Sequence, residues 1–155
     1  MPKIGIADTT FARFDMFGVA RKTIQDTGIS AELERYTVPG VKDLPIAAKK
    51  LAAEYECDIV LALGMPGPEQ IDKMCAHEAS TGIIQAQLMT NKHILEVFVH
   101  ADEADNERQL ANIVEDRTKK HALNAIALLK GKETLSKNAG MGIRQGHANE
   151  GQLLS

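Results

Sequence analysis

Two loop segments carry the residue types best suited to binding a flat, polar small molecule. Residues 8–13 read Asp-Thr-Thr-Phe-Ala-Arg and combine two hydroxyls with an aromatic ring. Residues 38–43 read Val-Pro-Gly-Val-Lys-Asp and lead into a helical pattern. Exposed N–H groups and the positive end of the helix dipole there suit a carbonyl or polyhydroxy ligand. The structural alternatives are a core aromatic ring and an ordinary capped turn.

Two further segments, 64–68 and 100–105, follow apolar runs in the same way. The first reads Gly-Met-Pro-Gly-Pro, and its glycines would let the backbone approach a ligand closely, although plain strand termination explains them too. The chain has no GxxxxGK[ST], HExxH or GxSxG motif, and the glycine series at 140–146 has the wrong spacing for GxGxxG. Nucleotide chemistry based on a phosphate-binding loop is therefore not supported.

Four short apolar runs, each followed by a helical pattern, must position these loops. The alternation predicts βα units around a parallel sheet. We expect strands at 3–7, 31–37, 58–63 and 94–99, and helices at 13–27, after Asp43, from the end of segment 64–68 to about 91, and at 106–129. Charges interrupt the run 31–37, which favours an edge strand, whereas 58–63 is continuously apolar and favours a central one. Ligands bind such sheets at the carboxyl ends of the strands, where the four loops should meet.

Two details of the helices follow from the same pattern. Asp43 is expected to cap the second helix, with Pro45 in its first turn. The third helix should bury one face, composed of Ile71, Met74, Cys75, Ala79, Ile83 and Ala86. The two cysteines, Cys57 and Cys75, form no CxxC motif and are expected to be buried free thiols.

The composition is that of one soluble domain. The chain has 155 residues, of which 44% are hydrophobic and 25% charged, so disorder and fibrous structure are excluded. Its 18 basic and 21 acidic residues provide no basic surface for nucleic acid or an anionic membrane. The longest apolar run is far too short to span a bilayer, and the N-terminus lacks a signal-peptide pattern, so we expect a cytoplasmic protein.

Longer stretches of the chain resemble a known family. Residues 38–45 (VPGVKDLP), 62–64 (ALG) and 75–83 (CAHEASTGI) are similar to motifs of the lumazine synthases. The chain as a whole more closely resembles their relatives, the archaeal-type riboflavin synthases. The matching stretches are 8–13, 37–45, 62–68, 75–80, 84–93 and 143–146, and the run QAQLMTNKH at 85–93 is the most specific of them.

The resemblance implies a fold and an assembly. The fold is α/β: a flavodoxin-like three-layer sandwich with a four-stranded parallel sheet flanked by helices. Residues 1–131 would form this domain, and 132–155 a C-terminal tail that packs at a subunit interface. The family further implies a homopentamer with sites between subunits. It also implies Mg²⁺ or another divalent cation as a helper, for which no ligand set stands out in the sequence.

The activity implied is that of riboflavin synthase, in which one 6,7-dimethyl-8-ribityllumazine donates a four-carbon unit to another. The products are riboflavin and 5-amino-6-ribitylaminouracil. Departures from lumazine synthase favour this activity: the segment after ALG is shorter, the catalytic His position falls near Gln70, and the phosphate-binding Arg position falls near Leu110. These changes suit a substrate without phosphate. Lumazine synthase and a non-catalytic lumazine or flavin binder remain the alternatives.

Site residues are carried over position by position. Phe11 would stack on the ring system, with Phe14 as the second choice; the chain has no Trp, four Phe and two Tyr, so a ring in a loop is better explained by stacking than by packing. Asp43 and His100 are the expected catalytic residues. The remaining binding residues would be Thr9, Thr10, Pro39, Gly40, Val41, Lys42, Gly64, Met65, Pro66 and Gly67, with Glu96, Val97 and Phe98 contributed by the fourth strand of a neighbouring subunit.

Overall fold

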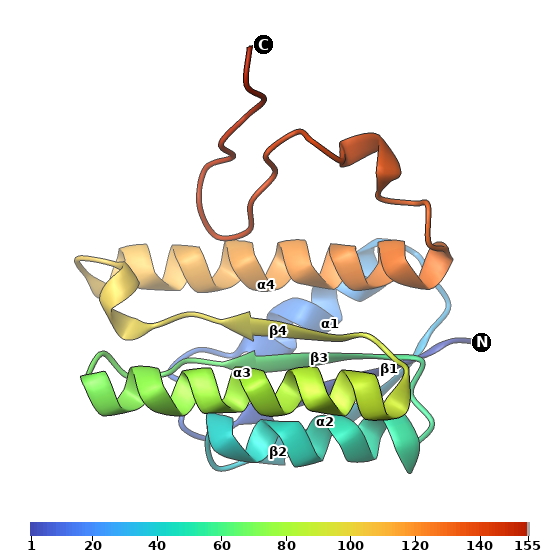
Figure 1. Cartoon of the computed structure of the whole chain (residues 1–155), viewed down its shortest axis with the longest axis horizontal. Coiled ribbons are helices and arrows are strands. Elements are labelled where there is room, and N and C mark those ends of the chain that lie inside the picture. The colour runs from blue at the N-terminus through green and yellow to red at the C-terminus, as the bar shows by residue number, and fades with distance from the viewer. Residues whose placement is uncertain (155) are drawn as a thin grey trace.

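The computed structural model describes residues 1–154 and contains one parallel sheet with strand order β2-β1-β3-β4 (Figure 1). The strands are β1 (Lys3–Thr9), β2 (Glu32–Val38), β3 (Ile59–Gly64) and β4 (Ile94–Phe98). All six residues of β3 are buried, and β2 lies at one edge of the sheet. Both placements confirm the predictions made from the continuous and the interrupted apolar runs.

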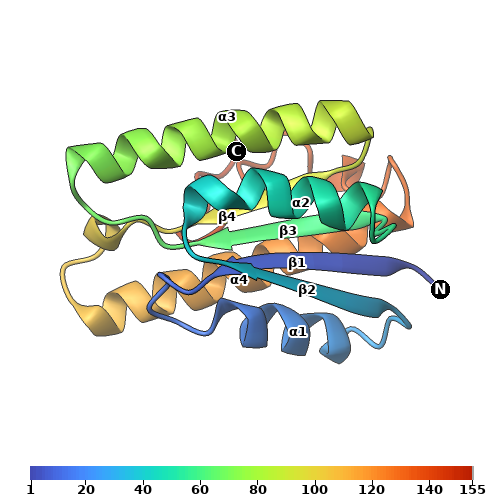
Figure 2. The same ribbon diagram turned by 90° about the horizontal axis from the view of Figure 1, so that it is seen from below.

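Helices cover both faces of the sheet and complete the three layers. The helix pair α1 (Met16–Asp26) and α4 (Glu107–Lys130) lies on one face, and α2 (Leu44–Ala53) and α3 (Gln70–Thr90) lie on the other (Figure 2). Alternate residues of the strands pack in two separate apolar clusters. Ile6 and Leu61 lie in the cluster between the sheet and the α1/α4 pair, and Ala7 and Val60 lie in the cluster between the sheet and the α2/α3 pair. The predicted α/β fold class is therefore confirmed.

The first helix begins three residues later than expected, which leaves a longer loop after β1. Asp15 stops the helix from extending backwards, because its carboxylate accepts the Gly18 N–H at 2.9 Å as an N-cap. The buried Thr9 hydroxyl accepts the Ala12 N–H at 3.1 Å. Phe11 consequently lies in a fixed loop and not in a helix.

The buried face of α3 differs from the prediction. Its buried residues are Ala76, Ala79, Ile83 and Ala86, whereas Ile71 and Met74 are exposed. Small alanines let α3 approach α2 and the sheet closely, and this turns the larger side chains of the first two turns outward. Cys75 is half-buried for the same reason, so the expectation of a buried thiol holds for Cys57 only.

After α4 the chain turns back, and residues 132–154, which we call the tail, run back along the outer side of α4 before their last part turns away from the helix (Figure 1). The turn begins at Gly131, the residue directly after the helix, which has a φ of 150°. Of the helices within residues 1–154, none is long and apolar enough to cross a membrane.

Candidate functional site

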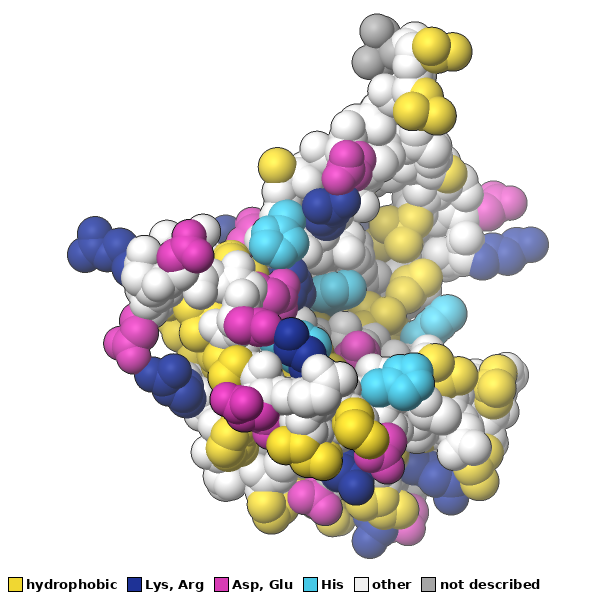
Figure 3. All heavy atoms as spheres, turned by 60° about the vertical axis from the view of Figure 1, so that its left-hand side comes forward, with side chains coloured by type: hydrophobic (Ala, Val, Ile, Leu, Met, Phe, Trp, Pro, Cys, Tyr) yellow, Lys and Arg dark blue, Asp and Glu magenta, His cyan; other side chains and the backbone are white. Residues whose placement is uncertain are grey.

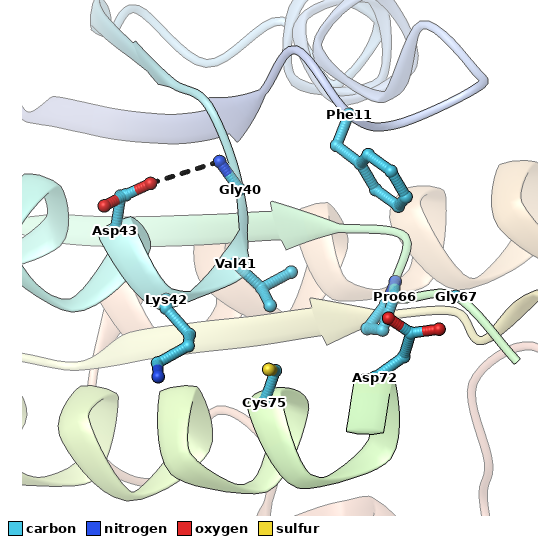
Figure 4. A pocket seen from close by; sticks show the side chains of 9 residues that line it. All are labelled: Phe11, Gly40, Val41, Lys42, Asp43, Pro66, Gly67, Asp72 and Cys75. Carbon is cyan, nitrogen blue, oxygen red and sulfur yellow. Dashed lines mark hydrogen bonds between the residues drawn. The ribbon is translucent and has the colours of Figure 1, made fainter. Parts of the chain in front are cut away.

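Three of the four predicted loops meet in a pocket of about 240 Å³ at the carboxyl ends of the strands (Figure 4), whereas residues 100–105 do not line it. We call it the strand-end pocket. It is built by the loops that follow β1, β2 and β3 and by the first turns of α3. Its lining residues are Phe11, Gly40, Val41, Lys42, Asp43, Pro66, Gly67, Asp72 and Cys75.

Phe11 projects from the β1 loop at the rim of the pocket and is 60% exposed. The loop is held by backbone hydrogen bonds to the end of β2 and to the loop after it, from the Thr10 N–H to the Val38 carbonyl at 2.9 Å and from the Phe11 N–H to the Pro39 carbonyl at 3.2 Å. The Thr10 hydroxyl donates to the same Pro39 carbonyl at 3.3 Å. The ring is thus presented to solvent on a fixed backbone, and the alternative of a core aromatic is wrong for Phe11.

Asp43 lines the pocket but does not cap α2 through its side chain. Residues Val41–Asp43 form a short 3-10 turn, and the Asp43 carboxylate reaches back to accept the Gly40 N–H at 3.2 Å. Asp43 occupies the N-cap position of α2 with Pro45 in the first turn, as predicted, but its side chain makes no capping hydrogen bond because the 3-10 turn engages the carboxylate. The hydrogen bond fixes the Gly40 backbone, and the carboxylate lies on the side of Gly40 away from Phe11 and Asp72 (Figure 4).

Other sequence-predicted residues support the pocket from behind. A Cβ atom on Gly64 would lie 2.8 Å from a Val41 methyl carbon and 3.1 Å from the Phe98 ring, so this glycine allows the two elements to pack together. Met65 is buried and lies, with Phe14, in a second pocket beside α4. Thr9, Thr10, Pro39, Gly64 and Met65 do not line the strand-end pocket itself.

The residues expected from a neighbour's β4 lie outside the strand-end pocket of their own chain. The Val97 side chain is enclosed between the sheet and the α1/α4 pair, and Phe98 is mostly buried. Glu96 is half-buried; burial raises the pKa of its carboxyl group, although a hydrogen bond from the Ser80 hydroxyl acts in the opposite direction. The His100 N–H donates to a Glu103 oxygen at 2.7 Å, which fixes the end of the strand.

Sequence reasoning did not identify Asp72 and Cys75 as site residues, although both face the pocket in Figure 4. Asp72 accepts the Glu69 N–H at 3.1 Å and so holds the first turn of α3. The spacing of Glu69 and Asp72 resembles a capping box, and this was the sequence pattern that could have indicated a role for Asp72 at the start of α3. Their position on the pocket wall depends on how α3 packs and leaves no trace in the local sequence.

Arg117, in the middle of α4, joins three parts of the chain. Its guanidinium donates to the Phe98 carbonyl at 2.9 Å and to the Gln145 carbonyl at 3.2 Å. It also contacts both carboxylate oxygens of Glu103, each at 2.9 Å, and its side chain is only 12% exposed. The end of β4, the following 3-10 turn (Ala101–Glu103) and the tail are therefore held by one largely desolvated ion pair.

Two tail residues complete this cluster. The Gly146 N–H donates to the Asp116 carboxylate at 3.0 Å, and His147 Nε2 lies 3.2 Å from Glu103 Oε1. Gly146 has a φ of 87°, and a Cβ atom there would lie 2.4 Å from Arg117 Nε. A glycine is thus required for the tail to pass this close to Arg117.

Arg117→Met should lower the free energy of unfolding by about 3 kcal/mol, because it leaves the Glu103 carboxylate without its partner in a partly buried place. Burial by itself raises the pKa of Glu103, but hydrogen bonds from Arg117, the His100 N–H and His147 outweigh it, so the pKa lies below 4.5. The stabilisation is therefore present above pH 4.5 and is lost as the pH falls through the folded-state pKa.

Urea unfolding of the variant and the parent protein at pH 7 and at decreasing pH below 4.5 measures this effect. Lys120→Met is the matched control, since Lys120 forms an exposed pair with Asp116 at 3.1 Å and should contribute less than about 1 kcal/mol. If the difference in the free energy of unfolding between Arg117→Met and the parent does not become smaller in acid, the ion-pair explanation is contradicted.

The described residues do not fit a metal ion held by protein ligands alone. Within residues 1–154, no group of three or more His, Cys, Asp or Glu side chains is placed to hold one. We therefore derive no step of the chemistry through a metal.

Comparison with known proteins defines the class of this chain. Residues 1–133 match the family model described as 6,7-dimethyl-8-ribityllumazine synthase, and the chain belongs to this family. A riboflavin synthase from Methanothermobacter marburgensis is 56% identical over 99% of this chain and 100% of its own. A riboflavin synthase from Archaeoglobus fulgidus is 48% identical over 98% and 99%. A 6,7-dimethyl-8-ribityllumazine synthase from Prochlorococcus marinus is 32% identical over 70% of each chain. The family resemblance seen in the motifs is confirmed.

Proposed function

We propose that this protein is a riboflavin synthase. The observation that carries the proposal is the match to riboflavin synthases over the whole chain, whereas the match to the Prochlorococcus marinus lumazine synthase is partial and weaker. The strand-end pocket agrees with it, because an exposed aromatic ring and a glycine-containing loop suit a flat heterocycle with a polyol chain. The proposed substrate is 6,7-dimethyl-8-ribityllumazine.

The proposed reaction balances without an oxidant or reductant. Two carbon–nitrogen bonds of the donor lumazine break, and two carbon–carbon bonds join its four-carbon unit to the methyl carbons of the acceptor. The four hydrogens that leave these methyl groups as protons end on the nitrogens of the pyrimidine product. The protein must therefore hold two identical molecules face to face and help move protons between them.

Orientation should supply most of the rate enhancement. Positioning two reactants correctly can remove about 7–11 kcal/mol of a barrier. Phe11 would stack on one ring system, while the backbone of Gly40–Lys42 and the carboxylate of Asp43 would bind ribityl hydroxyls. Asp43 and His100 are the proposed proton carriers, and such groups typically contribute about 10²–10⁴-fold.

The size of the strand-end pocket supports sites shared between subunits. Small-molecule sites usually enclose about 300–1,000 Å³, and the strand-end pocket of one chain offers about 240 Å³ for a reaction that needs two substrates. We propose that a neighbouring subunit completes the site with Glu96, Phe98 and His100, in a homopentamer located in the cytoplasm. Val97 would contribute through its backbone at most, since its side chain is enclosed.

Incubation of the purified protein with the lumazine alone tests the function, with flavin absorbance as the readout. We expect riboflavin to form without any other substrate. A lumazine synthase would instead require the pyrimidine and a butanone phosphate, and a non-catalytic binder would retain lumazine without turnover. The divalent cation remains a proposal from the family resemblance: prior treatment with EDTA should lower the rate and Mg²⁺ restore it, and an unchanged rate would remove the cation from the account.

A further inference from the structure

The Glu103 carboxylate lies at the centre of a polar cluster where the tail passes over the end of β4. Figure 3 shows acidic, basic and His side chains gathered below the tail. One oxygen of Glu103, Oε2, accepts the His100 backbone N–H at 2.7 Å and Nη1 of Arg117 at 2.9 Å. The other oxygen, Oε1, lies 2.9 Å from Nη2 of Arg117 and 3.2 Å from Nε2 of His147. Both oxygens are therefore fixed, in a side chain that is only 22% exposed.

The fixed carboxylate also faces the ring of His100. The distance from Glu103 Oε2 to His100 Nδ1 is 3.8 Å, which is longer than a hydrogen bond but short for an electrostatic contact. A negative charge at this distance favours a proton on the nearer ring nitrogen, because the N–H dipole then points at the carboxylate. Nε2, on the other side of the ring, then has no proton in the neutral imidazole and can accept one. The contact thus selects the nitrogen of His100 that can act as a base.

Glu103 keeps its negative charge at neutral pH. Burial raises the pKa of its carboxyl group, but hydrogen bonds from Arg117 and from the His100 N–H outweigh this effect, so the pKa lies below its ordinary value. Arg117 is itself held from two sides, by the Phe98 carbonyl at 2.9 Å and by the Gln145 carbonyl of the tail at 3.2 Å. The tail and α4 therefore hold the carboxylate that faces His100.

The backbone around His100 is fixed as well, which leaves its ring as the part that remains to be oriented. The Val99 N–H donates to the Gly64 carbonyl and the Ala101 N–H donates to the Pro66 carbonyl, each at 3.1 Å. These two acceptors belong to the end of β3 and to the loop after it, which forms part of the strand-end pocket. The His100 side chain is 29% exposed, so its ring reaches the surface at the carboxyl edge of the sheet.

Two other carboxylates close to His100, those of Asp102 and Glu96, are bound by different groups. Asp102 forms an ion pair with Lys73 at 2.6 Å, and Glu96 accepts a hydroxyl hydrogen bond from α3. Within residues 1–154, Glu103 supplies the only carboxylate oxygen at ion-pair distance from the His100 ring. The geometry therefore distinguishes Glu103 from the acidic residues around it.

We propose that Glu103 is a positioning residue for His100 and presents the Nε2 atom of its ring for proton transfer. The inference rests on the proposed function, in which His100 is a proton carrier. Both oxygens of Glu103 are already bound within the chain, so Glu103 acts through His100 and not on the substrate. Arg117 and the tail support this arrangement, because they hold Glu103 and the end of β4.

The tautomer of His100 tests the proposal without any substrate. Nitrogen NMR of protein labelled at histidine distinguishes a proton on Nδ1 from a proton on Nε2, and the His100 signal is identified by its loss in His100→Gln. In the parent protein at alkaline pH, where imidazoles are neutral, we expect the proton on Nδ1. Glu103→Gln should shift the equilibrium toward the Nε2–H form, because the charge is lost. A parent protein with the proton on Nε2 would overturn the proposal.

Kinetics of Glu103→Gln provide the second readout. The glutamine retains an oxygen for the His100 N–H but has no charge, so kcat should fall by about 10-fold or more while KM stays within about 2-fold of the parent value. Asp102→Asn is the matched control, since it removes a negative charge from the same 3-10 turn but from a residue that pairs with Lys73. It should change neither kcat nor KM.

A double variant separates this role from a general structural one. Added to His100→Gln, Glu103→Gln should lower kcat no further, because it acts only through the His100 ring. An equal additional loss in both backgrounds would overturn the proposal, and urea unfolding of each variant ensures that only folded protein is compared. A parent protein that forms no flavin would count against the proposed function alone, since the NMR measurement still decides whether Glu103 sets the tautomer of His100.

Discussion

Asp43→Asn should lower kcat for flavin formation by about 10²-fold or more, the usual effect of removing a proton-transfer group. Asp43 is one of the residues that line the strand-end pocket, and its carboxylate accepts the Gly40 N–H at 3.2 Å. An asparagine retains an oxygen for this hydrogen bond but cannot take up a proton at neutral pH. The variant therefore separates proton transfer from the shape of the loop, and its urea midpoint should match that of the parent.

Asp72→Asn is the matched control for Asp43→Asn. Asp72 also lines the strand-end pocket and also accepts a backbone N–H three residues earlier in the chain, from Glu69. If Asp43 carries the proton, Asp72→Asn should lower kcat much less. Equal losses in the two variants would show that the pocket requires negative charge in general and would refute the assignment to Asp43.

Mixed oligomers extend this test to the sharing of sites between subunits. His100 does not line the strand-end pocket of its own chain, so we expect it to act on the neighbour's pocket. His100→Gln and Asp43→Asn proteins, each with strongly reduced activity alone, should regain activity after they are unfolded and refolded together, because some sites then combine an intact Asp43 with an intact His100. No recovery in mixtures that contain both chains would contradict the shared site.

Phe11→Ala should lower kcat/KM by about 10- to 100-fold, since stacking of a ring on a flat base contributes about 1–3 kcal/mol. Phe11 is 60% exposed, so its removal should leave the free energy of unfolding within about 0.5 kcal/mol of the parent. Phe11→Tyr should keep most of the activity. Steady-state kinetics with urea unfolding on the same samples measure both effects.

Tyr55→Ala is the matched control for Phe11→Ala, because Tyr55 is another exposed aromatic residue but packs edge-on against Tyr36 at 6.4 Å, away from the strand-end pocket. It should lower stability without raising KM. A Phe11→Ala protein with the parent's kinetics would show that a different ring stacks on the substrate, and Phe14 would then be tested next.

The strands were predictable because their patterns depend on local burial. The run Ile59–Leu63 is apolar without interruption and forms a strand buried on both faces, and the charged run 32–35 lies in the edge strand β2. The meeting of the loops followed from the parallel direction of the strands. Phe11, Gly40 and Asp43 could therefore be placed together from the sequence.

The features that were missed depend on packing between distant segments. The exposure of Ile71 and Met74 reflects the close contact that alanines allow between α3 and its neighbours. The tail is held to α4 by Arg117 and Asp116, which bind the backbone of Gln145 and Gly146, and nothing in the local sequence indicates these contacts. The roles of Glu96 and His100 depend on a second chain and stay predictions.

The mass balance of the reaction tests the central claim most directly. The protein is incubated with 6,7-dimethyl-8-ribityllumazine as the sole substrate, and substrate and products are quantified by chromatography over time. The account predicts that two lumazines disappear for each riboflavin and each 5-amino-6-ribitylaminouracil that form. Folded protein that binds the lumazine and yields no riboflavin, or that yields a product only when pyrimidine and butanone phosphate are supplied, would contradict it.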